Sequence, residues 1–287
     1  MQLRSPAVAG TFYPSDPAQL SALVDRLLAD AARASQPDLD RTAVIGLLVP
    51  HAGLAYSGTI AALGWRLAAD IEPTAIVIAG TDHHAQAAGV GVWLGGPWQT
   101  PLGDVPVDED LGRRIAAFGP PFERDDEAHL LEHSIEVQLP LLARACPAAK
   151  IVPLAVSPRL RTHSEAGRAL GQLLDELRRD GERILLVASS DFAHYPPADI
   201  CRDVDDQLLE PLLRLDADQL HRLDQSLASA GLPGLVCGMC GIDPATFVLA
   251  ACDPMGGTRG ELLGKATSAD AGGDARRTVG YAAVALV

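Results

Sequence analysis

Three short apolar runs, each followed by polar residues, constrain the fold of this chain more than any other feature. The runs span residues 43–49, 75–79 and 184–188, are rich in Val, Ile and Leu, and show no alternation of polar and apolar residues. Continuous runs of this length are typical of strands that are covered on both faces of a parallel sheet. The pattern therefore predicts an α/β fold in which helices flank a central, mostly parallel sheet.

Each run is followed within a few residues by side chains that bind metals or move protons. In chain order these side chains are His51, then Asp82, His83 and His84, then Ser190, Asp191 and His194. In open α/β sheets, ligands bind at the carboxyl ends of the strands. We therefore expect these residues to meet at one edge of the sheet and to form a functional site.

Length and charge narrow the class of protein. The chain has 287 residues, of which 48% are hydrophobic, and we expect a single domain over residues 1–287. Its formal net charge is −14 and its Lys and Arg residues are scattered, which argues against a nucleic-acid partner. There is neither an N-terminal signal region nor a run of about 20 apolar residues, so a cytoplasmic protein without a membrane contact is expected.

The five cysteines predict no disulfide, because their number is odd and a secretion signal is missing. Cys237 and Cys240 have the CxxC spacing of a redox pair or of half a zinc site. No second CxxC completes a four-thiolate zinc site, and a thioredoxin motif would follow the first strand of its fold. A structural role for this spacing is therefore favoured, with one of the two cysteines still a candidate ligand.

The remaining elements follow from periodicity and from turn residues. Asp16 and Pro17 open a helix, and Asp243 before Pro244 is expected to cap another. Further helices are predicted at 59–69, 166–177, 203–213 and 216–228, and further strands at 150–156, 261–266 and 278–287. Residues 89–106 predict a strand or hairpin with loops that could line the site. Trp93 and Trp98 could stack on a substrate there, but packing against the core is the favoured interpretation.

Residues 125–136 concentrate acids and histidines ahead of an apolar pattern, which predicts the entrance to a helix. Glu132 and His133 lie where a helix start can direct polar groups into a crevice, so they are candidate site residues. His129 is expected to be exposed. His163 and His221 fall on polar helix patterns and are interpreted as structural.

Asp191 and His194, three residues apart, suit an imidazole acid/base oriented by a carboxylate, or a pair of metal ligands. Together with Ser190, these two residues could also form the triad of a serine hydrolase. The chain lacks the Gly-x-Ser-x-Gly elbow of such enzymes, which makes triad hydrolysis the weaker hypothesis.

Several segments together resemble the Memo family, named for a mediator of cell motility. They are residues 4–14 (RSPAVAGTFYP), 50–53 (PHAG), 132–136 (EHSIE), 190–195 (SDFAHY), 240–241 (CG) and 281–285 (YAAVA). The resemblance spans nearly the whole chain. It implies similarity to class III extradiol dioxygenases, which are non-heme iron enzymes with an α/β fold. It also implies a functional link to a radical SAM protein, beside which bacterial members of the AmmeMemoRadiSam system protein B type are often encoded.

Carried over residue by residue, the resemblance puts the metal ligands at His51, His83 and Cys240, with Asp191 and His194 in the same pocket. His83 is preferred to His84 because the family motif keeps the first position, and because neighbouring strand residues face opposite ways. The resemblance implies Fe(II) as the cofactor, while a thiolate ligand also suits Cu(I) or Zn(II). We expect neutral imidazoles, a Cys240 thiolate and proton transfer by His194.

Other residues are expected behind or beside the ligands. Glu132 and His133 are candidates for contacts that orient the ligands, and Ser190 is a further candidate for the pocket. Asp82 departs from the family pattern, and its role is open.

The leading hypothesis is a metal-binding, dioxygenase-like oxidoreductase acting on a small molecule, for which an aromatic character is implied only by the resemblance. One alternative is a module that keeps the pocket and binds a peptide or protein, as eukaryotic Memo proteins would imply. Another is a metal-dependent hydrolase with a metal-activated water near Asp191.

Overall fold

The computed structural model describes residues 3–287, which form one eight-stranded sheet and a separate two-stranded ribbon of β4 and β5. The sheet order is β6-β3-β7-β2-β8-β1-β10-β9. The strands are β1 (Gly46–Val49), β2 (Ala75–Thr81), β3 (Val90–Val92), β4 (Trp98–Thr100), β5 (Gly103–Val105), β6 (Phe122–Arg124), β7 (Lys150–Val156), β8 (Ile184–Ser189), β9 (Gly260–Thr267) and β10 (Gly280–Leu286). β7, β2, β8 and β1 are mutually parallel, whereas β3 and β10 join them antiparallel. The predicted mostly parallel sheet is confirmed.

Both faces of the central strands are buried, which explains their uninterrupted apolar sequence. Alternate residues of β2 enter different cores: Val77 and Ala79 pack in one, Ile76 and Ile78 in the other. A polar residue in the middle of either register would be buried without a partner, so residues 75–80 of β2 and 184–188 of β8 carry none, and the polar Thr81 and Ser189 stand only at the strand ends.

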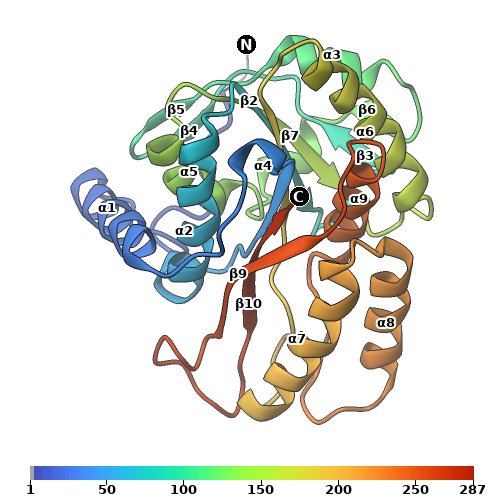
Figure 1. The fold of residues 1–287 in the computed structure, drawn as a ribbon. Helices are drawn as coiled ribbons and strands as arrows, with labels where there is room; N and C mark the ends of the chain where they lie inside the picture. The colour runs from blue at the N-terminus through green and yellow to red at the C-terminus, as the bar shows by residue number, and fades with distance from the viewer. Residues whose placement is uncertain (1–2) are drawn as a thin grey trace.

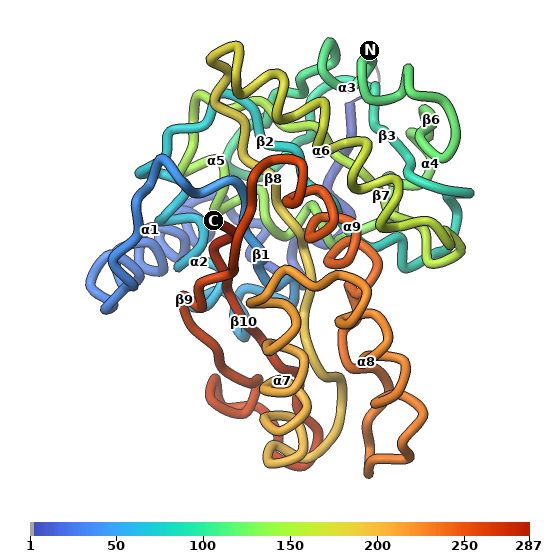
Figure 2. The backbone as a smooth tube through the Cα atoms, turned by 45° about the vertical axis from the view of Figure 1, so that its right-hand side comes forward, coloured from blue at the N-terminus to red at the C-terminus, as the bar shows by residue number. Residues whose placement is uncertain are grey.

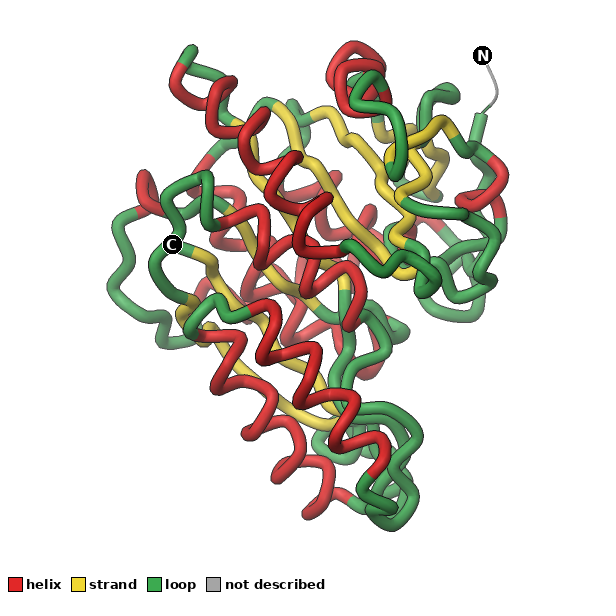
Figure 3. The backbone as a smooth tube through the Cα atoms, turned by 90° about the vertical axis from the view of Figure 1, so that its right-hand side faces the viewer, coloured by secondary structure: helices red, strands yellow, loops and turns green. Residues whose placement is uncertain are grey.

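Helices cover the two faces (Figure 1). They are α1 (Pro17–Arg33), α2 (Leu54–Ile71), α3 (Glu109–Ala116), α4 (Glu127–Leu130), α5 (Leu139–Ala145), α6 (His163–Arg179), α7 (Ala198–Leu213), α8 (Ala217–Ser229) and α9 (Ile242–Cys252). α1, α2 and α5 pack together on one face, and α6 and α9 on the other. The strands thus form a layer between helices (Figure 3), while α7 stands beside the β9–β10 hairpin and α8 packs against α7 and α9 (Figure 2).

The structure corrects several expectations about boundaries. The helices predicted from 59 and 203 each begin five residues earlier, at Leu54 and Ala198. The first strand begins at Gly46 instead of residue 43, because the Asp40 carboxylate accepts the backbone N–H of Thr42 and starts a 3₁₀ turn at Arg41–Ala43. α9 begins at Ile242, so Asp243 lies in its first turn and does not cap it. The helix entrance predicted within 125–136 is broken into α4 and a 3₁₀ turn, Glu136–Gln138, before α5.

β2, β8 and β1 are adjacent and parallel, so the segments that follow them leave from the same edge of the sheet. The connection that ends at α9 reaches this edge as well, since Gly241 packs against Ser190 just after β8. The site described below therefore lies where three strands end and one helix begins. No helix within residues 3–287 combines the length and the apolar character needed to span a bilayer.

Candidate metal centre

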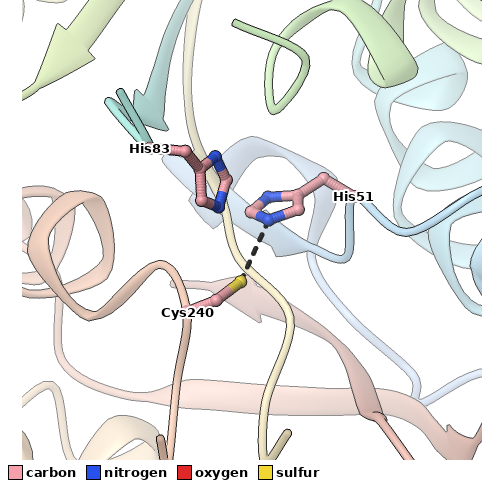
Figure 4. A group of neighbouring side chains, drawn as sticks. All are labelled: His51, His83 and Cys240. Atoms are coloured by element: carbon pink, nitrogen blue, oxygen red, sulfur yellow. Dashed lines mark hydrogen bonds between the residues drawn. The ribbon is translucent and has the colours of Figure 1, made fainter. Parts of the chain in front are cut away.

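Three side chains from separate parts of the chain converge at the edge of the sheet (Figure 4). His51 follows β1, His83 follows β2, and Cys240 lies two residues before α9. One donor atom from each lies within 4.8 Å of the donor atoms of the other two. The Sγ atom of Cys240 is 3.0 Å from Nε2 of His51, and the two imidazole rings are nearly perpendicular, with centroids 5.4 Å apart.

The hydrogen bonds around His51 decide which ring nitrogen faces the site. Ser189 Oγ donates its only proton to the carbonyl of Ser134 at 2.6 Å and accepts an N–H of Gln138 at 2.9 Å. Towards Nδ1 of His51, 3.3 Å away, this oxygen can therefore act only as an acceptor. Nδ1 then carries the proton, and the lone pair of Nε2 is directed at Cys240.

Glu132 holds His83 in the equivalent orientation. Its Oε2 accepts the backbone N–H of His83 at 2.8 Å, and its Oε1 accepts the Nδ1–H at 2.9 Å. Nε2 of His83 is left for the site, in the carboxylate–histidine arrangement that orients metal ligands. Burial lowers the pKa of His83, but the hydrogen bond to Glu132 and the charges of Glu132, Asp191 and Asp82 together outweigh burial, so the pKa lies above its usual value.

The electrostatics of the cluster suit a cation. Burial lowers the pKa of His51 to about 3 and that of His133 to about 4, so both rings are neutral near pH 7. Burial, together with the nearby Asp191 carboxylate, raises the pKa of the Cys240 thiol. The expected thiolate therefore requires compensating positive charge, which a bound metal ion would supply. Two imidazoles and a thiol fit Fe(II), Cu(I) or Zn(II) as a donor set.

Asp191 and His194 stand beside these three residues. Oδ1 of Asp191 accepts the backbone N–H groups of His51 at 2.7 Å and Ala52 at 3.2 Å, which ties the end of β1 to the segment after β8. His194 donates its Nδ1–H to the carbonyl of Phe192 at 2.8 Å, because a carbonyl can only accept. Its Nε2 therefore keeps a lone pair. Ligand atoms of Asp191, His194 and Cys240 also lie within 4.8 Å of one another.

A cavity of about 620 Å³ opens in front of the cluster. His51, His83, His133, Asp191, His194 and Cys240 line it. Sequence reasoning missed the rest of its wall, which includes Phe12, Tyr56, Tyr195, Tyr281 and Arg277. These residues come from segments far apart in the chain, and only Phe12, Tyr195 and Tyr281 belong to motifs that the sequence singled out.

Several candidates lie outside the cavity wall. His84 is exposed, with Nε2 3.3 Å from the carbonyl of Leu131, so His83 and not His84 enters the site. Asp82 is buried and accepts the backbone N–H of Ala87 at 2.7 Å, which shapes the turn after β2. Ser190 donates to the carbonyl of Asp191 instead of a ligand, and Ser189 makes the contact to His51.

The expectation that His129 is exposed is wrong. The ring is fully buried, and Nε2 lies 2.9 Å from the carbonyl of Gly91. It packs edge-on against Trp93 and Trp98, both also fully buried, so the interpretation of the two tryptophans as packing residues is confirmed. Burial of this kind cannot be anticipated from the local acidic sequence.

Cys237 does not join the donor groups formed by the described residues, and the cysteines there are all free. The absence of disulfides predicted from the odd count thus agrees with the described part of the chain.

Comparison with known proteins supports a family assignment over the full length. The family model described as "Memo-like protein" matches residues 4–285. A MEMO1 family protein of Desulfurococcus amylolyticus is 36% identical over 292 residues, covering 99% of each chain. MEMO1 family proteins of Aquifex aeolicus and Nitrosopumilus maritimus are 34% and 30% identical, with at least 98% of each chain covered. The chain belongs to the Memo family.

Proposed function

We propose that this protein binds one metal ion, in the first place Fe(II), through His51, His83 and Cys240, and acts as a dioxygenase-like oxidoreductase on a small molecule. The observation that carries the proposal is the convergence of three donor atoms within 4.8 Å, each presented from a different segment. Both imidazoles have Nδ1 engaged by a neighbour, which leaves Nε2 for a metal.

The number of donors favours catalysis over a structural role. Structural zinc sites are closed by four protein ligands, whereas catalytic sites use three and keep a position for substrate or water. Here the cavity of about 620 Å³ adjoins the three donors, so a small molecule can reach them. A bound iron ion would supply redox chemistry and open positions for oxygen and substrate.

Residues beside the three donors move a proton and hold the metal ligands in place. His194, whose Nδ1–H is held by the Phe192 carbonyl, offers Nε2 to take a proton from a substrate hydroxyl and return it. Asp191 keeps the His51 segment in place through two backbone N–H groups. The rings of Phe12 and His133, with centroids 4.7 Å apart, pack against each other on the cavity wall and give it an apolar surface beside the donors.

The test is metal analysis of protein purified without oxygen and without an affinity tag. The wild type is compared with Cys240→Ser and with Cys237→Ser, a matched control that alters the neighbouring cysteine outside the donor group. We expect about one Fe(II) per chain in the wild type and the control, and loss of iron in Cys240→Ser and in His51→Ala. Oxygen uptake with small aromatic compounds then tests the redox chemistry.

Two results would contradict the proposal. Absence of metal after challenge with Fe(II), Cu(I) and Zn(II) would leave the peptide- or protein-binding module as the better explanation. Stable zinc with ester hydrolysis that disappears on chelation would instead indicate a metal-dependent hydrolase.

A further inference from the structure

Arg277 stands out on the cavity wall. It lies in the connection between β9 and β10, and it is the only Arg or Lys among the described residues that line the cavity. Its guanidinium lies 4.1 Å from the centroid of the Tyr195 ring and makes no ion pair or hydrogen bond with any side chain of residues 3–287. The neighbouring Arg276, by contrast, is paired with Asp274. Arg277 is exposed and lines the cavity, so in a chain of net charge −14 it is a cation that an anionic ligand entering the cavity from solvent can reach.

The backbone fixes Arg277 relative to the catalytic candidates. Tyr195 donates its backbone N–H to the carbonyl of Thr278 at 2.6 Å, and Thr278 donates to Pro196 at 2.9 Å. A bridge also joins His194 to Val279. Tyr195 adopts a φ of +74°, a strained value that persists only where neighbours enforce it. The backbone segments that carry Tyr195 and Arg277 are thus held side by side, and the Tyr195 ring lies against the guanidinium.

The other walls suit a flat, apolar body. The rings of Phe12, Tyr56 and Tyr281 line the same cavity as Arg277. Aromatic walls bind planar groups through stacking and edge contacts. A volume of about 620 Å³ is in the range of pockets that enclose small organic molecules.

The charge balance selects the kind of anion. One arginine faces the cavity, while the carboxylates of Asp191 and Asp274 also line it and repel a second negative charge. The planar fork of a guanidinium matches a carboxylate through two parallel N–H bonds. We propose that Arg277 anchors the carboxylate of a small, planar organic acid whose body lies against the aromatic wall. The inference rests on the proposed function in one respect, since it names the substrate class for that same cavity.

The experiment compares acids with their neutral amides. Dissociation constants of benzoate, benzamide, trans-cinnamate and trans-cinnamamide are measured by ligand-observed NMR, on metal-free protein and again after anaerobic loading with Fe(II). The variants are Arg277→Gln and, as a matched control, Arg202→Gln, which removes an exposed arginine that pairs with Asp270 outside the cavity. Thermal melts check that both variants are folded.

We expect the wild type and Arg202→Gln to bind at least one acid about tenfold more tightly than its amide, the effect of a charge-assisted hydrogen bond. In Arg277→Gln this preference should fall to about threefold or less. Equal binding of acids and amides by the wild type, or failure to bind either acid, overturns the inference, as does a preference that survives in Arg277→Gln. Tighter binding of inorganic phosphate than of both acids overturns the choice of a carboxylate.

The two proposals fail separately. Protein that takes up no metal but still prefers the acids would remove the redox function and leave the anion site. Protein that binds iron through Cys240 without any preference for acids would remove the anion site and leave the metal centre.

Discussion

At the scale of single residues, Glu132 positions the ligand His83 and the backbone around it by accepting four hydrogen bonds. Its carboxylate accepts three backbone N–H groups, those of His83, His133 and Ser134, each at 2.8 Å, and the Nδ1–H of His83 at 2.9 Å. Burial raises the pKa of Glu132, but the hydrogen bond from His83, the charge of His83 and the further contacts to His133 and Ser134 together outweigh burial and hold the pKa well below the usual range. Glu132 therefore remains ionised and joins the end of β2 to the segment after α4.

Replacing Glu132 with Gln tests this role. A glutamine has one acceptor oxygen and an NH₂ group, so at least one contact to His83 becomes a clash of two donors. We expect metal affinity to fall by about 10–100-fold, as for other residues that orient metal ligands. Competition with a chelator measures the change. Glu127→Gln, at an exposed position of α4, is the control, and equal affinity in both variants would rule out the orienting role.

At the scale of elements, the close packing of α6 on α9 helps to place Cys240, since α9 begins two residues after it. Two glycines of α6 permit the approach. A Cβ atom at Gly167 would lie 2.1 Å from the carbonyl oxygen of Phe247, and one at Gly171 would lie 2.2 Å from that of Ala251. Neither oxygen can move alone, because both belong to the backbone of α9.

Gly171→Ala sets two effects against each other. Alanine favours a helix over glycine by about 1 kcal/mol, whereas overpacking a core costs about 1–3 kcal/mol or more. Since the clash is with backbone, we expect the clash to win and the free energy of unfolding to fall by about 2 kcal/mol. Urea denaturation checks the sign. Gln172→Ala, at the exposed neighbouring position, should change stability by less than about 0.5 kcal/mol. A Gly171→Ala variant more stable than the wild type would show that α9 shifts to accommodate the added methyl group.

The turn that carries Cys240 is anchored by α8. Asp224 of α8 accepts the backbone N–H of Met239 at 2.8 Å, and a Cβ atom on Gly238 would lie 2.5 Å from the same carboxylate. Asp224→Ala leaves this buried N–H without its partner, at a cost of about 1–3 kcal/mol.

We expect Asp224→Ala to lower both thermal stability and metal affinity, because the Cys240 turn loses its anchor. Asp218→Ala, at the start of the same helix, should leave metal affinity unchanged. Unaltered metal binding in Asp224→Ala would mean that the turn holds its shape without α8.

At the scale of the whole molecule, stability should depend on pH through a carboxyl that belongs to none of the donor groups. Asp205 of α7 accepts the backbone N–H of Ala193 at 3.0 Å and faces Cys201 from its own helix. Lys265 of β9 and Asp206 are the other charged neighbours. Burial raises the pKa of Asp205 to about 7, so the folded state retains a proton that the unfolded chain releases near pH 4.

The sign follows from this difference. Between about pH 4 and 7 the folded state binds more protons, so the contribution of Asp205 to stability falls as pH rises, by at most about 1.4 kcal/mol per pH unit, and is constant above that range. Asp205→Asn keeps an acceptor for Ala193 and removes the titration. As pH rises across this window, we expect the unfolding free energy of the variant to increase relative to that of the wild type. A difference independent of pH would contradict the raised pKa.

The sequence predicts best those strands and site residues whose positions depend on neighbours along the chain. Strands β2, β7 and β8 were predicted within two residues of their bounds, because burial on both faces leaves an unbroken apolar run. His51 and His83 were candidates because each follows such a run, and in parallel strands those ends share an edge. The sequence indicates Ser190 as a pocket candidate, but Ser189 contacts His51, because a sequence does not show which of two adjacent serines faces the histidine.

By itself, the sequence determined the α/β class, the family, and the segments that supply the site, because hydrophobic periodicity and motif residues are properties of neighbours along the chain. Tertiary structure alone decided how distant segments meet. The burial of His129 between two tryptophans, the hold of Glu132 on His83, and the place of Arg277 on the cavity wall all join residues separated by dozens of positions. Such contacts depend on how helices and loops pack across the sheet, and that packing leaves no periodic trace in the sequence.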